Sequence, residues 1–133
     1  MKAPFLREIA FKGAVFSGNG EGRKFIDLPW VKSQIQEKLG FTPYSGTLNI
    51  RLSKESMTQK NLLENAKQLE IHPAEGYCKG TLIKAQVDVL KCAIIIPKVP
   101  SYPSDVLEVI ASVCLRESLK VTDGSQVTVT VKV

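Results

Sequence analysis

Three glycines at alternating positions form the first chemical signal in the chain, in the segment Gly18-Asn19-Gly20-Glu21-Gly22. Glycines let a ligand approach the main chain closely, and successive amides in such a loop can bind an anion. The segment lacks both the Gly-Lys-Ser/Thr ending of a Walker A loop and the spacing of a dinucleotide fingerprint. On spacing alone, a simple turn between two elements is favoured over an anion site.

A second signal is the pair Thr47 and Asn49, which lie two residues apart in an alternating segment. On a strand they point to the same face and present a hydroxyl and an amide oxygen. Such neutral, hard ligands suit Mg²⁺ when phosphates and waters complete the coordination. Taken alone, the pair is better explained as two polar residues on a solvated strand face.

Glu108 is the third candidate, since it interrupts the apolar segment 106–111. A carboxylate there must face water or find partners, and it could accept hydrogen bonds from a ligand. An exposed strand glutamate explains it equally well. His72 is the only histidine, and without a nucleophile elbow it does not support a hydrolase.

These residues need a scaffold of strands. Alternating or β-rich apolar segments predict six strands, at residues 8–18, 47–52, 78–90, 91–97, 106–111 and 127–133. Asp27 as N-cap, Pro29 in the first turn and Gly40 at the end predict a helix over 29–39. Further helical segments are expected at 57–69 and 115–119. Strands with glycine turns favour a mainly β fold with inserted short helices, closed as a small barrel.

Length and composition fit one domain over residues 1–133, with 44% hydrophobic and 23% charged residues. No apolar run could cross a membrane, and no signal-peptide core is expected near the N-terminus. The three cysteines, Cys78, Cys92 and Cys114, are expected to be reduced and mostly buried, which favours the cytoplasm. The net charge of +5 suits a protein that handles phosphates or nucleic acid and does not distinguish the two, but the basic residues are scattered, which argues against a DNA-binding face.

Taken together, the segments resemble the archaeal CTP-dependent riboflavin kinase family. The resemblance extends from Gly13 to the C-terminus. It is carried by residues 13–22 (GAVFSGNGEG), 39–49 (LGFTPYSGTLN), 94–98 (IIIPK), 107–111 (LEVIA), 115–117 (LRE) and 123–124 (DG).

The resemblance implies a six-stranded cradle-loop (RIFT-related) β-barrel that moves the γ-phosphoryl group of CTP to the 5′-hydroxyl of riboflavin, giving FMN and CDP. It assigns one Mg²⁺ ion to Thr47 and Asn49, and flavin binding to Glu108, our candidate for orienting or deprotonating the hydroxyl. The nucleotide would bind at Ala14, Val15, Phe16, Ser17, Gly18 and Asn19, and at Val113, Cys114, Leu115 and Arg116.

The chain departs from the family at Pro100, which takes the place of a threonine eight residues before the glutamate. Proline has neither a hydroxyl nor an N–H, so a flavin contact there is lost, and Ser101 is the candidate replacement. Ser45 and Ser112 are further departures.

We expect a monomeric cytoplasmic enzyme that binds riboflavin, FMN, CTP and CDP, without nucleic acid or membrane. The alternatives are a barrel that binds nucleotide or flavin without transferring phosphate, and a small basic DNA-binding barrel. Some family members carry an N-terminal helix-turn-helix domain, and none is expected here.

Overall fold

The computed structural model describes residues 7–77 and 79–133. Its elements follow the chain in this order: β1 (Glu8–Phe16), α1 (Glu21–Ile26), α2 (Pro29–Leu39), β2 (Leu48–Leu52), α3 (Lys54–Thr58), the 3₁₀ helix η1 (Lys60–Asn65), β3 (Leu69–Ile71), β4 (Gly80–Val87), β5 (Leu90–Pro97), β6 (Val106–Ile110), α4 (Leu115–Leu119) and β7 (Gln126–Lys132). All the predicted strands are present, with Cys78 outside the described residues.

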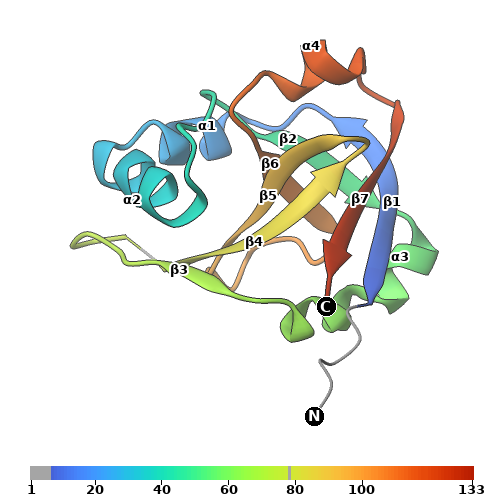
Figure 1. The fold of residues 1–133 in the computed structure, drawn as a ribbon, viewed down its shortest axis with the longest axis horizontal. Coiled ribbons are helices and arrows are strands. Elements are labelled where there is room, and N and C mark those ends of the chain that lie inside the picture. Colours follow the sequence, from blue (N-terminus) through green and yellow to red (C-terminus); the bar gives the residue numbers. More distant parts are fainter. Residues whose placement is uncertain (1–6, 78) are drawn as a thin grey trace.

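Six strands form a closed antiparallel barrel, as the sequence predicts (Figure 1). The strand order is β4-β5-β6-β2-β1-β7, and β7 pairs back onto β4. The short strand β3 adds to the part of β4 that β7 leaves open. Because the barrel closes, few strand edges are left with unpaired backbone groups. The sheet therefore needs few helices to cover its edges.

The barrel interior holds the larger of two hydrophobic clusters, with Phe11, Ile50 and Val129 fully buried. The strict alternation of β2 and β7 follows from this arrangement, since one face of each strand looks inward and the other looks outward.

A second cluster covers the outer face of β4 and β5, where α1 and α2 pack. Ile26, Val31 and Ile35 from the helices are fully buried there. Because β4 and β5 are covered on both faces, neighbouring residues such as Ile94 and Ile95 are both buried. This accounts for the continuous apolar run in the sequence.

Two predictions about the helices are corrected. Leu28, not Asp27, is the N-cap of α2, because a short helix, α1, precedes it and ends at Asp27. The bounds of α2 and its end at Gly40, with φ of 79°, are confirmed.

The helix expected over 57–69 is confirmed only in part, since α3 ends at Thr58, the 3₁₀ helix η1 covers Lys60–Asn65, and Leu69 begins a strand. Ser53 caps the short helix α3 by accepting a hydrogen bond from the Ser56 amide at 3.2 Å, and η1 follows. The chain then leaves the helical path, the Gln68 side chain donates to the Leu63 carbonyl at 2.7 Å, and Leu69 pairs with Leu82 in the sheet. Strand pairing with β4 therefore outweighs the local helical spacing.

Burial raises the pKa of the Cys92 thiol to about 12, as expected of an inert core cysteine. Cys114 is only half-buried. Among the described helices, none combines the length and apolar character that a membrane span requires.

Candidate functional site

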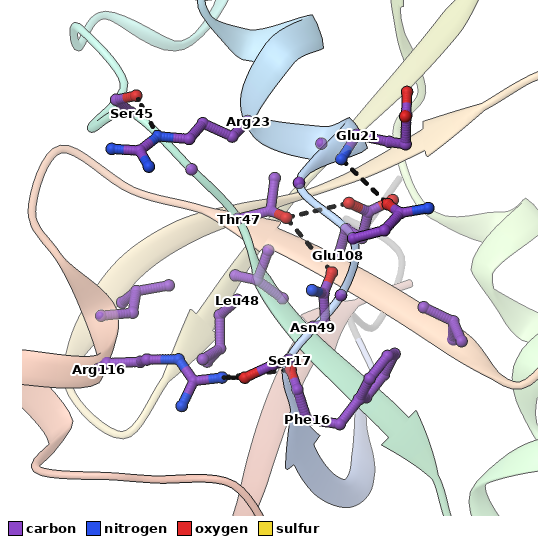
Figure 2. Close-up of a pocket in the computed structure, with 18 of the residues that line it drawn as sticks. Phe16, Ser17, Glu21, Arg23, Ser45, Thr47, Leu48, Asn49, Glu108 and Arg116 are labelled. Carbon is purple, nitrogen blue, oxygen red and sulfur yellow. Dashed lines mark hydrogen bonds between the residues drawn. The ribbon is translucent and has the colours of Figure 1, made fainter.

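One end of the barrel, where α1 and α4 lie (Figure 1), contains a cavity of about 970 Å³ (Figure 2). Its walls come from the glycine loop, the start of β2, β6, the loop before β6, and the segment that enters α4. A cavity of this size suits a ligand as large as a nucleotide. The predicted site residues that line it are Phe16, Ser17, Gly18, Asn19, Thr47, Asn49, Ser101, Glu108, Val113, Cys114, Leu115 and Arg116.

Three of the predicted residues, Thr47, Asn49 and Glu108, form one polar cluster, although Glu108 lies 59 or more positions after the other two in the chain. β2 and β6 are neighbours in register, so Asn49 stands opposite Glu108. The Thr47 hydroxyl donates to Glu108 Oε1 at 3.0 Å and lies 3.3 Å from Asn49 Oδ1 (Figure 2). A hydroxyl has one proton, and the shorter distance to a charged acceptor assigns it to Glu108.

The glycine loop lies directly over this cluster. A Cβ atom added at Gly22 would stand 2.6 Å from Thr47 Oγ1 and closer still to Glu108 Oε1. A Cβ at Gly18 would stand 2.5 Å from Asn49 Nδ2. A side chain at either position would force the cluster side chains to move, so glycine permits this close approach, which the simple-turn interpretation of the loop does not explain.

Glu108 has a second partner that sequence reasoning missed. The Tyr102 hydroxyl donates to Glu108 Oε2 at 2.6 Å. Burial, followed by the hydrogen bond to Glu108, raises the pKa of Tyr102 well above its ordinary value, so the phenol stays a donor. Tyrosine in a proline-rich loop carries no sequence signal for this contact.

The loop before β6 places some of its residues at the cavity, while the flavin contacts expected near Pro100 and Ser101 stay a prediction. Ser101 and Tyr102 line the large cavity, whereas Pro100 is not among the lining residues. A hydroxyl therefore reaches Glu108 from this loop, and it belongs to Tyr102.

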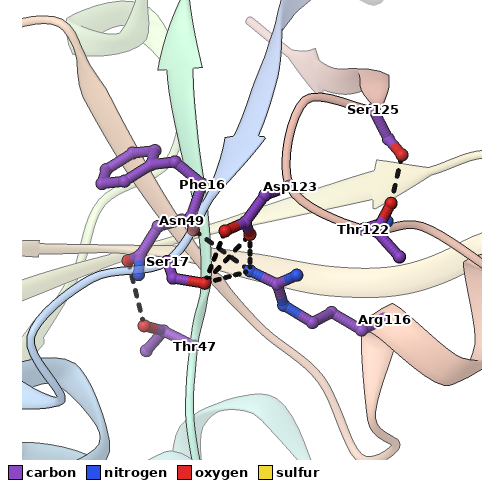
Figure 3. Close-up of polar contacts among 8 residues, drawn as sticks. All are labelled: Phe16, Ser17, Thr47, Asn49, Arg116, Thr122, Asp123 and Ser125. Atoms are coloured by element: carbon purple, nitrogen blue, oxygen red, sulfur yellow. Dashed lines mark hydrogen bonds and ion pairs between the residues drawn. The ribbon is translucent and has the colours of Figure 1, made fainter.

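On another wall of the cavity, Arg116 of α4 links the end of β1 to Asp123 (Figure 3). Its guanidinium donates to the Phe16 carbonyl at 3.2 Å and pairs with Asp123 at 2.8 Å. The Ser17 hydroxyl also donates to Asp123, at 2.9 Å. Hydrogen bonds from Arg116 and Ser17 lower the pKa of Asp123, so this carboxylate remains charged and fixes the end of β1 against α4.

Ala14 and Val15 lie in β1 and do not line the cavity. The Val15 side chain is buried, its amide donates to the Ser125 carbonyl at 2.9 Å, and its own carbonyl accepts from the Gly124 amide at 2.7 Å. These main-chain groups are committed to the barrel, and a nucleotide contact by either residue stays a prediction.

A second cavity of about 240 Å³ adjoins the first. Its lining is mostly apolar and includes Phe25, Ile95 and Pro97. Glu108 and Tyr102 line both cavities, so their hydrogen bond lies in the wall between the two.

The residues present fit a divalent cation held mainly by its substrate. Within residues 7–77 and 79–133, no three acidic, histidine or cysteine side chains group as a metal site. Thr47 Oγ1 and Asn49 Oδ1 nevertheless lie side by side on the cavity wall. Because Thr47 gives its proton to Glu108, its lone pairs remain available to a cation. Hard oxygen ligands of this kind suit Mg²⁺.

Comparison with known proteins identifies a matching family. Residues 15–131 match the family model CTP-dep_RFKase, described as "Domain of unknown function DUF120".

The chain is also similar to three proteins named riboflavin kinase. The protein of Archaeoglobus fulgidus is 42% identical over 92% of this chain and 54% of its own length. That of Methanosarcina barkeri is 34% identical over 98% and 60%, and that of Ignicoccus hospitalis is 35% identical over 94% and 72%. The chain thus spans little more than half the length of the first two relatives. It belongs to the CTP-dependent riboflavin kinase family.

Proposed function

We propose that this chain transfers the γ-phosphoryl group of CTP to the 5′-hydroxyl of riboflavin. A bond forms between the riboflavin oxygen and the γ-phosphorus, the bond from that phosphorus to the bridging oxygen of CDP breaks, and the hydroxyl proton leaves. One observation carries the proposal: Thr47, Asn49 and Glu108 meet beneath the glycine loop on the wall of the large cavity, and Glu108 also lines the small apolar one.

The geometry suits phosphoryl transfer because that reaction needs positioning and charge neutralisation more than covalent help from the protein. Thr47 and Asn49 would hold one Mg²⁺ ion, which when bound supplies positive charge to the phosphates. Thr47 keeps its oxygen turned to the cation by donating its proton to Glu108. Gly18 and Gly22 bring the loop backbone down onto the same cluster.

Glu108 would orient the acceptor hydroxyl. Both of its oxygens accept from hydroxyl groups, Oε1 from Thr47 and Oε2 from Tyr102, so the carboxylate has a defined direction. Each oxygen has a second lone pair that could accept the 5′-hydroxyl of riboflavin. Tyr102 is a positioning residue in this scheme, since it acts through Glu108.

The two cavities divide the substrates. The large one would bind CTP, with residues 16–19 and 113–116 around the base and ribose, and main-chain groups there would recognise cytosine. The flavin ring would approach from the apolar cavity beside Phe25 and Ile95. A purine is larger and carries a different donor and acceptor pattern, so ATP should be a poor donor.

Two features bear on a second candidate, a barrel that binds these ligands without transferring phosphate. Pro100 lacks the family's hydroxyl, which favours this alternative. The hydrogen bond from Tyr102 to Glu108 opposes it, because a hydroxyl from the same loop reaches the cluster.

The test is to incubate the protein with riboflavin, Mg²⁺ and each nucleoside triphosphate, and to separate FMN from riboflavin by chromatography. FMN formed with CTP and far less with ATP supports the kinase. Nucleotide binding without FMN from any donor supports the binding barrel. We also infer that the chain acts as a monomer in the cytoplasm, and size-exclusion chromatography with light scattering tests the monomeric state.

A further inference from the structure

Three arginines line the large cavity, and two of them already have carboxylate partners. Arg116 pairs with Asp123 at 2.8 Å. Arg51 pairs with Asp105 at 3.4 Å, and its guanidinium carbon lies 4.4 Å from the centroid of the Phe16 ring. These two cations are therefore neutralised by the protein itself.

Arg23 differs from both. Among the described residues, no carboxylate oxygen lies within 4.0 Å of its guanidinium nitrogens. Its Nε donates to the Ser45 hydroxyl at 3.3 Å (Figure 2), and that hydroxyl donates to Asp27 Oδ2 at 3.0 Å. Ser45 thus holds the base of the guanidinium, while no hydrogen bond to a described residue is found for either terminal nitrogen of Arg23.

Arg23 lines the same cavity as the polar cluster. Arg23 directly follows Gly22, the residue in closest approach to Thr47 and Glu108. Consecutive Cα atoms lie about 3.8 Å apart, so the Arg23 backbone is one residue from the point where the chain comes closest to Thr47 and Glu108. The side chain then extends along the cavity wall toward Ser45.

We propose that Arg23 binds the phosphates of the nucleotide and that Ser45 positions it for this contact. A guanidinium donates two parallel hydrogen bonds to phosphate oxygens, and its charge complements a polyphosphate better than a neutral lining does. The proposal rests on the proposed function only in taking the large cavity as the nucleotide site. It adds a phosphate ligand that belongs to neither of the two segments assigned to the nucleotide.

Isothermal titration calorimetry with CDP and Mg²⁺, and separately with cytidine at millimolar concentration, tests the proposal. Arg23→Ala should weaken CDP binding about 10- to 100-fold, the range expected for charge-assisted hydrogen bonds. Cytidine binding should stay within twofold, because cytidine has no phosphate. Arg23→Lys keeps the charge without the fork and should fall between wild type and Arg23→Ala.

Lys24→Ala is the matched control. Lys24 carries the same charge one residue away, is 77% exposed, pairs with Glu21 at 3.9 Å and does not line the cavity. CDP affinity in this variant should stay within twofold of wild type. Ser45→Ala removes the anchor but not the charge, and a smaller loss of about two- to fivefold is expected.

Equal CDP affinity in Arg23→Ala and Lys24→Ala overturns the proposal, as does an equal loss of CDP and cytidine binding, which would indicate a change in cavity shape. Absence of CDP binding to the wild type overturns it as well. The FMN assay remains separate: a wild type that makes no FMN but needs Arg23 for CDP refutes the kinase alone. If the wild type forms FMN but CDP binds equally well to wild type and Arg23→Ala, the phosphate contact alone is refuted.

Discussion

Gly22→Ala should damage catalysis far more than it damages folding. The added methyl group would stand 2.6 Å from Thr47 Oγ1, which is 0.8 Å below the 3.4 Å where ordinary contact begins, and closer still to Glu108. Either the loop must lift or the Thr47 and Glu108 side chains must move by a comparable distance. A misplacement of about 1 Å at a reacting centre costs on the order of 10²-fold in rate.

The effect on stability should be small because two contributions oppose each other. Overpacking typically costs about 1–3 kcal/mol, while alanine in a helical position is favoured over glycine by about 1 kcal/mol. Gly22 lies in α1 and has no left-handed backbone angle that would penalise alanine. We therefore expect a fall of about 10²-fold in kcat/KM for riboflavin phosphorylation with CTP, and a midpoint of unfolding within a few degrees of wild type.

Gly40→Ala is the matched control for this experiment. Gly40 has φ of 79°, ends α2, does not line the cavity, and has open space where a Cβ would stand. Alanine there should cost about 1–2 kcal/mol of stability through backbone strain, with kcat/KM nearly unchanged. If Gly22→Ala keeps kcat/KM within threefold of wild type, the loop is not fixed against the cluster and the reasoning fails.

Four further outcomes are expected. Glu108→Gln should lower FMN formation about 10²- to 10⁴-fold at unchanged fold, and unchanged turnover would remove this residue from any role toward the hydroxyl. Tyr102→Phe should cost about 1.5 kcal/mol in denaturant unfolding, the lower end for bonds to charged groups because the phenol is partly exposed. Since the pKa of Tyr102 is raised in the folded state, its contribution should be complete below pH 10 and decline above it, and a wild-type profile that matches the variant above pH 10 would contradict this. Iodoacetamide should modify Cys114 before the buried Cys92, as measured by peptide mapping, and bound CDP should slow the reaction at Cys114. An equal labelling rate at Cys114 with and without CDP would argue against the proposed nucleotide position. Because the pKa of Asp123 is lowered in the folded state, its carboxylate stabilises the fold above about pH 3.8, and this stabilisation is lost as the pH falls through the lowered value. Asp123→Asn should therefore make the free energy of unfolding depend less on pH below pH 4. An unchanged pH dependence would count against the ion pair.

Local patterns in the sequence determined much of the barrel. The alternation in β2 and β7 requires one inward face, and Pro29 with Gly40 delimits α2 through backbone geometry that neighbouring residues cannot change. Such signals depend on a few adjacent residues, and they are readable without knowledge of the fold. The resemblance to a known family then selected Thr47, Asn49 and Glu108 from many polar strand residues.

Tertiary structure decided the rest, because those features depend on partners far away in the chain. Leu69 joins a strand rather than a helix since β4 offers it hydrogen bonds, and no spacing within 57–69 reveals this. The register of β2 against β6 places Glu108 beside Thr47. The roles of Tyr102 and Arg23 depend on the loop before β6 and helix α1 lining one cavity, since these roles come from the acceptors that the two side chains meet there and not from their neighbours in sequence.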